Sequence, residues 1–127
     1  MLYDATTKRG GLIMGQAIIA VVDDMFFAAK IRAVAEAVGV EISFPRTLEA
    51  LVQKVHEAKP RLIIVDLHNQ KIDANALANE LKSDEIRLLG FFSHVQTELQ
   101  RNAMAAGFDQ VIPRSVFARD LSKILSV

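Results

Sequence analysis

Acidic residues stand directly after two apolar runs, where a folded chain could use them together. Asp23 and Asp24 follow the run AIIAVV, and Asp66 follows RLIIV. Such runs are typical of buried parallel strands, whose carboxyl ends face the crevice in which open α/β sheets bind ligands. Three carboxylates gathered there would repel one another unless a cation joined them. The sequence therefore predicts a divalent metal site built around a reactive aspartate.

Each acidic position also has a purely structural interpretation. Aspartate favours helix N-termini, so Asp24 could simply cap a helix that begins near Met25. Asp66 could be a turn residue after its strand. The joint interpretation is more specific, because the first and third strands of a doubly wound sheet are neighbours where the strand order reverses. The acids at their ends are therefore expected to meet.

Two further polar residues are predicted at the same edge of the sheet. Ser93 follows the run LLGFF, and Arg114 follows FDQVIP. Together with the acids they would supply a hydroxyl and a fixed cation beside a carboxylate nucleophile. Phosphoryl transfer needs such groups, because its transition state spreads negative charge over equatorial oxygens. Mg²⁺ suits the acids, since it is a hard ion that binds carboxylate, water and phosphate oxygens. A turn role for Ser93 and a solvated Arg114 are the simpler alternatives.

The elements that must position these residues alternate along the chain. Apolar runs predict strands at 17–22, 40–44, 62–65, 86–92 and 108–112, with 40–44 at an edge. Helical repeats lie between them and after the last one, and Ser115 is expected to cap the final helix. Five strands alternating with five helices predict an α/β fold: a parallel sheet with helices on both faces. Residues 1–15 show no periodicity and are expected to be a leader or disordered tail, which leaves 16–127 as one domain.

Composition excludes several classes of function. Fifteen basic residues balance fifteen acidic ones, so no electrostatic footprint for nucleic acid or an anionic membrane is present. The chain has no cysteine, which rules out disulfides and thiolate chemistry. No apolar run approaches the length of a membrane span. A cytoplasmic protein is the simplest expectation.

Five short motifs resemble the receiver domain of two-component response regulators, and the resemblance covers roughly residues 17–127. They are VVDD at 21–24, IIVDL at 63–67, FFS at 91–93, AAGFD at 105–109 and VIPR at 111–114. The resemblance implies a flavodoxin-like (βα)5 sheet with strand order 2-1-3-4-5. It also implies a signalling domain rather than an enzyme, apart from self-catalysed phosphotransfer.

The resemblance assigns a role to each residue at the predicted edge. Asp66 would accept a phosphoryl group from a histidine kinase or a phosphotransfer protein. Asp23, Asp24 and Asp66, with the backbone carbonyl of His68, would hold Mg²⁺. Ser93 and Arg114 would contact the phosphoryl oxygens. A downstream protein would bind the face formed by the fourth helix, fifth strand and fifth helix. A homodimer through the last two helices is also possible.

The sequence departs from the family at residues that would pass the signal from the site to a partner protein. Arg114 stands where the family has lysine, and Ser115 rather than proline follows it. Val111 occupies the position of the family's switch aromatic. These departures favour an atypical member, and they motivate an alternative: a degenerate receiver that acts as a phosphorylation-independent interaction module. A flavodoxin-like domain that binds a small molecule is a third hypothesis.

Overall fold

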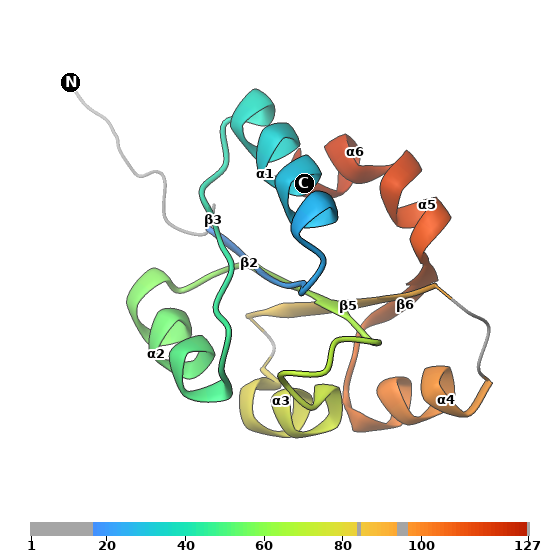
Figure 1. The fold of residues 1–127 in the computed structure, drawn as a ribbon. Helices are drawn as coiled ribbons and strands as arrows, with labels where there is room; N and C mark the ends of the chain where they lie inside the picture. The colour runs from blue at the N-terminus through green and yellow to red at the C-terminus, as the bar shows by residue number, and fades with distance from the viewer. Residues whose placement is uncertain (1–16, 84, 94–96, 127) are drawn as a thin grey trace.

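A five-stranded parallel sheet forms the centre of the chain (Figure 1). The computed structural model describes residues 17–83, 85–93 and 97–126, so the predicted leader at 1–15 lies outside the described residues. The strands run in the order β3-β2-β4-β5-β6, which is the predicted order 2-1-3-4-5. They are β2 (Ile18–Val21), β3 (Ile42–Ser43), β4 (Leu62–Asp66), β5 (Arg87–Phe92) and β6 (Gln110–Pro113).

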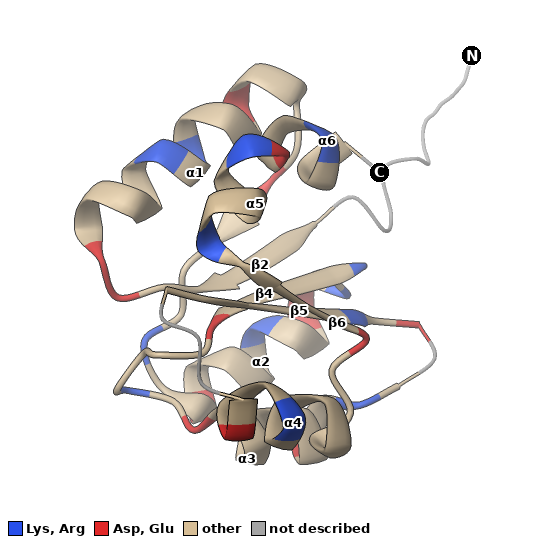
Figure 2. Ribbon diagram, turned by 90° about the vertical axis from the view of Figure 1, so that its right-hand side faces the viewer, with Lys and Arg blue, Asp and Glu red and all other residues tan. Residues whose placement is uncertain are grey.

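Helices cover both faces of this sheet (Figure 1). One layer holds α1 (Met25–Val38), α5 (Arg114–Arg119) and α6 (Leu121–Ser126). The other holds α2 (Leu48–Ala58), α3 (Ala74–Leu81) and α4 (Thr97–Ala106). Acidic and basic residues are interspersed over both layers (Figure 2). No helix of the described residues is long and apolar enough to cross a bilayer.

Two hydrophobic cores lie on opposite faces of the sheet because strand side chains alternate. Ile18 and Ala20 of β2 face α1, α5 and α6, whereas Ile19 and Val21 face the other layer. Strand β4 is buried along its whole length, as expected of a central parallel strand. Packing on both faces therefore fixes the carboxyl ends of the strands in place.

Several helix boundaries follow local signals that the sequence carries. Asp24, Thr47 and Asp73 cap α1, α2 and α3 by accepting backbone N–H groups. Gly39 ends α1 with φ 79°, a left-handed conformation that glycine adopts without strain.

Two predicted strands begin two residues later in the structure than predicted. The edge strand is only Ile42–Ser43 rather than 40–44, because it has one neighbour to pair with. The last strand is Gln110–Pro113 rather than 108–112, since Phe108 turns into the core after Gly107.

The final helix also differs from the prediction. Pro113 stands at its N-cap and the helix begins at Arg114, so Ser115 does not cap it. Asp120 then interrupts the helix and divides it into α5 and α6. Pro113 has φ −64° and ψ 148°, an extended conformation that ends β6, and it supplies no side-chain cap to the helix.

Candidate functional site

The five predicted residues lie at the same edge of the sheet. Asp66 ends β4, where it pairs in register with Phe91 of β5, and Ser93 follows directly after that strand. Asp23 and Asp24 follow β2, the other neighbour of β4. Arg114 follows β6, whose Pro113 pairs with Phe92. Because all strands are parallel, their carboxyl ends bring these residues to one side of the domain.

Asp66 is buried, with 8% of its surface exposed. Its Oδ1 accepts a hydrogen bond from the backbone N–H of His68 at 2.9 Å. Burial raises the pKa of the Asp66 carboxyl, and the nearby charge of Asp23 acts in the same direction. The His68 amide, the His68 charge and the Arg114 charge oppose this rise in pKa. The result is a carboxylate that is poorly solvated when ionised.

The loop after Asp66 is built by side chains that the sequence interpretation did not single out. The Asn69 amide donates to the carbonyl of Asp66 at 2.8 Å, and its Oδ1 accepts from the backbone N–H groups of Lys71 and Ile72. The N–H of Gln70 donates to Asp23 Oδ2 at 3.0 Å. An asparagine soon after a strand end is a known turn signal, so Asn69 could have been found. The bond between Gln70 and Asp23 joins the two acidic loops.

Asp24 serves both as a helix cap and as an ion-pair partner. Its Oδ1 accepts from the N–H groups of Phe26 and Phe27 at 2.9 and 3.1 Å. Its Oδ2 accepts from an Nη of Arg114 at 3.2 Å. The Phe27 amide and then the Arg114 guanidinium hold the pKa of Asp24 below its ordinary value. The capping role that the sequence left open is therefore present, and Arg114 is added to it.

Arg114 also stacks on an aromatic ring. Its guanidinium carbon lies 4.0 Å from the centroid of the Phe27 ring. Phe27 in turn meets Phe91 and Phe117 edge-on, with centroids 5.5 and 5.8 Å away. Phe91 and Phe117 are stacked, with centroids 4.7 Å apart. This aromatic cluster fixes the ring on which Arg114 rests.

The acidic edge offers the oxygen donors that a Mg²⁺ site would need. Carboxylate and carbonyl oxygens are the ligands that Mg²⁺ prefers, so the residue types fit. Within residues 17–83, 85–93 and 97–126, however, no three His, Cys, Asp or Glu residues form a group that could hold a metal ion. In this arrangement Arg114 engages Asp24. The assignment of Asp23, Asp24, Asp66 and the His68 carbonyl as ligands stays a prediction.

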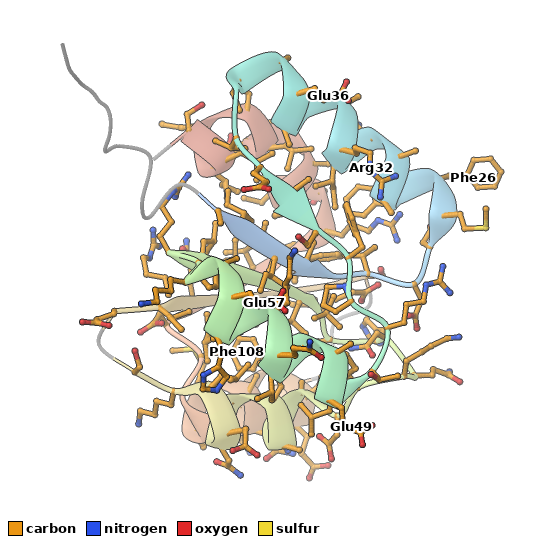
Figure 3. The ribbon with its side chains drawn as sticks, turned by 90° about the vertical axis from the view of Figure 1, so that its left-hand side faces the viewer. Phe26, Arg32, Glu36, Glu49, Glu57 and Phe108 are labelled. Atoms are coloured by element: carbon orange, nitrogen blue, oxygen red, sulfur yellow. The ribbon has the colours of Figure 1, made fainter. Side chains whose placement is uncertain are left out.

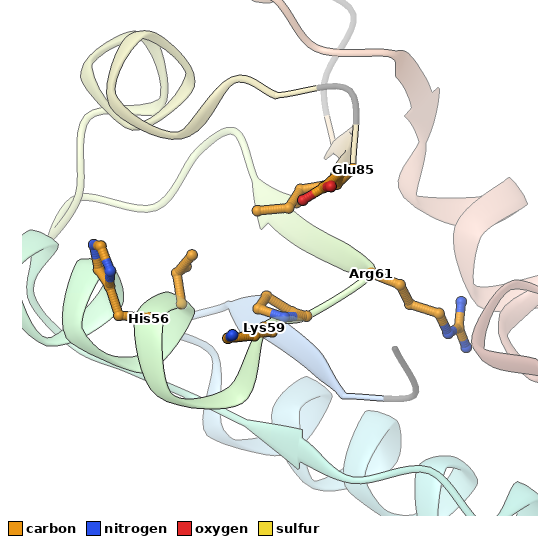
Figure 4. Close-up of a pocket in the computed structure, with 7 residues that line it drawn as sticks. His56, Lys59, Arg61 and Glu85 are labelled. Carbon is orange, nitrogen blue, oxygen red and sulfur yellow. The ribbon is translucent and has the colours of Figure 1, made fainter. Parts of the chain in front are cut away.

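Two other surface features lie outside the acidic site. A pocket of about 540 Å³ is lined by residues that include His56, Lys59 and Glu85, beside the starts of β4 and β5 and thus at the opposite end of the sheet (Figure 4). Arg61 also lines that pocket, and its guanidinium donates to the carbonyl of Leu125 at 2.6 Å. At the acidic end, the ring of Phe26 projects away from the body of the domain and is 90% exposed (Figure 3).

Comparison with known sequences gives a partial match. No family model matches the chain. The response regulator protein VraR of Staphylococcus aureus is 30% identical over 73 residues, which cover 56% of this chain. That match spans 35% of the length of VraR, so the chain corresponds to about a third of this relative.

Comparison with solved structures gives a match over most of the chain. A response regulator receiver domain from Bermanella marisrubri has a TM-score of 0.74 at 18% identity, over 87% of this chain and 95% of the other. A CheY-like receiver domain from Methanospirillum hungatei has a TM-score of 0.74 at 19% identity, over 86% and 89%. A response regulator from Hahella chejuensis has a TM-score of 0.74 at 20% identity, over 87% and 92%. The chain therefore has the fold of the receiver domains of response regulators, as its motifs predicted.

Proposed function

We propose that this domain receives a signal by accepting a phosphoryl group on Asp66. The observation that carries the proposal is the placement of Asp66: it is the one charged residue of the described part of the chain that is buried, and it ends the central strand at the sheet edge. Ligands of open α/β sheets bind at such an edge. A buried carboxylate is poorly solvated, which favours its use as a nucleophile once it is ionised.

The transfer step uses groups that surround Asp66. Oδ1 is engaged by the His68 amide, so Oδ2 is the oxygen that attacks phosphorus. A new P–O bond forms as the bond from phosphorus to the donor breaks, and the leaving group departs with the electron pair of that bond. With acetyl phosphate the leaving group is acetate; with a phosphohistidine it is an imidazole that takes up a proton from water. Ser93 and Arg114 are the candidates to bind the phosphoryl oxygens, since both stand at the same edge.

The donor and the recipient of the signal are proposed from the likeness to response regulators. A histidine kinase or a phosphotransfer protein would supply the phosphoryl group, and a downstream protein would bind the altered surface. The added charge would act through local electrostatics, as other phosphorylation switches do.

Intact-mass spectrometry tests the proposal. The protein is incubated with excess acetyl phosphate and Mg²⁺, and the wild type is expected to gain one phosphoryl group. Asp66→Asn should gain none, because an amide oxygen is a poor nucleophile. Asp73→Asn is the matched control: Asp73 is an exposed helix cap, and asparagine caps equally well, so this variant should gain a phosphoryl group as the wild type does.

A second candidate function is a phosphorylation-independent interaction module. The engagement of Asp24 by Arg114 and the valine at position 111 favour it. It predicts that the wild type stays unmodified even at saturating donor. A mass increase that disappears in Asp66→Asn excludes this candidate.

A further inference from the structure

We infer that Arg114 and a divalent cation compete for the Asp24 carboxylate, so that the domain holds its own metal site closed. The inference deepens the proposed function and rests on the same acidic edge. The Arg114–Asp24 contact at 3.2 Å is the observation that carries it.

Both oxygens of Asp24 are already engaged. Oδ1 accepts two backbone N–H groups from the first turn of α1, and Oδ2 accepts the guanidinium of Arg114. Neutral N–H groups can share a carboxylate with a metal ion. A guanidinium cannot easily do so, because its positive charge would repel a divalent cation on the same oxygen. Arg114 must therefore leave before Oδ2 can bind a metal.

Arg114 is held more firmly than an ordinary surface cation. Its side chain is 34% exposed and that of Asp24 is 40% exposed, so water screens the pair only in part. The guanidinium also rests on the face of Phe27. Phe27 is itself fixed by Phe91 and Phe117, so the ring cannot follow the cation outward. Metal binding must thus break an ion pair and a cation–π contact together.

Release of Arg114 would also prepare the neighbouring carboxylate. Arg114 directly follows β6 and Asp66 ends β4, so both stand at the carboxyl edge of the sheet. A guanidinium displaced from Asp24 can bind phosphoryl oxygens at Asp66 in a forked geometry. The cation would then open the site and transfer Arg114 to its second partner in one exchange.

Titration of the full chain with Mg²⁺ tests the competition, with affinity measured by calorimetry and by amide chemical shifts. Arg114→Gln should bind Mg²⁺ about tenfold more tightly than the wild type, because roughly that factor corresponds to one partly shielded ion pair with a cation–π contact. Arg114→Lys keeps the charge but loses the fork and the stacking, and should fall between the two. Arg119→Gln removes the same charge from an arginine of α5 that pairs with Asp120, and should bind as the wild type does.

Equal Mg²⁺ affinity in wild type and Arg114→Gln overturns the inference, as does the absence of binding in both. A second measurement guards against a variant that fails to fold. In the wild type, the Nε–H resonance of Arg114 should shift at saturating Mg²⁺ while that of Arg119 stays in place; an unmoved Arg114 resonance also overturns the inference. If Asp66 is phosphorylated but wild type and Arg114→Gln bind Mg²⁺ equally well, this inference alone is overturned. If Arg114→Gln binds Mg²⁺ more tightly but Asp66 is not phosphorylated, the proposed function alone is overturned.

Discussion

The Asp24 side chain has two roles, as a helix cap and as an ion-pair partner. One oxygen caps α1 and the other pairs with Arg114, so the structural and the electrostatic roles belong to different atoms. Aspartate after a strand and before a helix predicts the cap from sequence alone. The partner on the second oxygen could not be predicted, because it depends on where α5 begins and on the rotamer of an arginine ninety residues away in sequence.

Asp66 differs from Asp24 in the direction of its pKa shift, and this gives a stability prediction. Burial raises the pKa of Asp66, so folding disfavours its ionised form. Below the pKa that Asp66 has in the unfolded chain, the carboxyl is neutral in both states and its burial does not reduce the free energy of unfolding through charge. As the pH rises through the higher pKa of the folded state, ionisation of Asp66 lowers the stability of the folded protein. We expect Asp66→Asn, which cannot ionise, to be more stable than the wild type at pH 7, with the difference shrinking as the solution is acidified.

Urea unfolding followed by far-UV circular dichroism at several pH values measures this difference, since the chain has no tryptophan and one tyrosine. The buffer contains no divalent cation. Asp73→Asn, at an exposed cap, should show no such pH-dependent gain. A neutral-pH stability of Asp66→Asn below that of the wild type would contradict the account of a poorly solvated carboxylate.

At the scale of elements, the sequence predicts type and order better than length. Alternation of apolar runs and helical repeats was enough to predict five parallel strands, and the resemblance to receiver domains implied their order in the sheet. The edge strand is shorter than predicted because tertiary pairing, which a single segment does not encode, decides how far it extends. The last helix is divided at Asp120, and Phe117, Leu121 and Leu125 from its two parts lie in the same core.

The end of α1 offers a test of element-level conformation. Gly39 has φ 79°, and a Cβ added there meets no atom within 4 Å, so Gly39→Ala changes backbone strain without a clash. We expect a loss of roughly 1 kcal/mol in the free energy of unfolding.

Lys59 provides the opposite substitution at the end of α2. It is a non-glycine residue with φ 49°, so Lys59→Gly relieves a left-handed conformation and should not destabilise the protein as Gly39→Ala does. Both variants are compared with the wild type by urea unfolding. Unchanged stability in Gly39→Ala would show that the helix end relaxes to another conformation.

At the scale of the whole molecule, the sheet brings together residues from four strand ends that are far apart in sequence. The site position could be predicted because parallel strands share one carboxyl edge. The state of the site could not, because the engagement of Asp24 by Arg114 and the fixed Phe27 ring depend on two elements of one helical layer meeting above that edge. The fold supplies a stable support for the acidic edge, and the contacts of individual side chains decide how that edge is used.

The central claim is that phosphoryl transfer takes place at Asp66, and mapping the modified residue tests it most directly. After incubation with acetyl phosphate and Mg²⁺, borohydride reduction converts an acyl phosphate of aspartate to homoserine, which tandem mass spectrometry can locate. The account predicts homoserine at position 66. Homoserine at another position, or unmodified Asp66 at saturating donor, would contradict it.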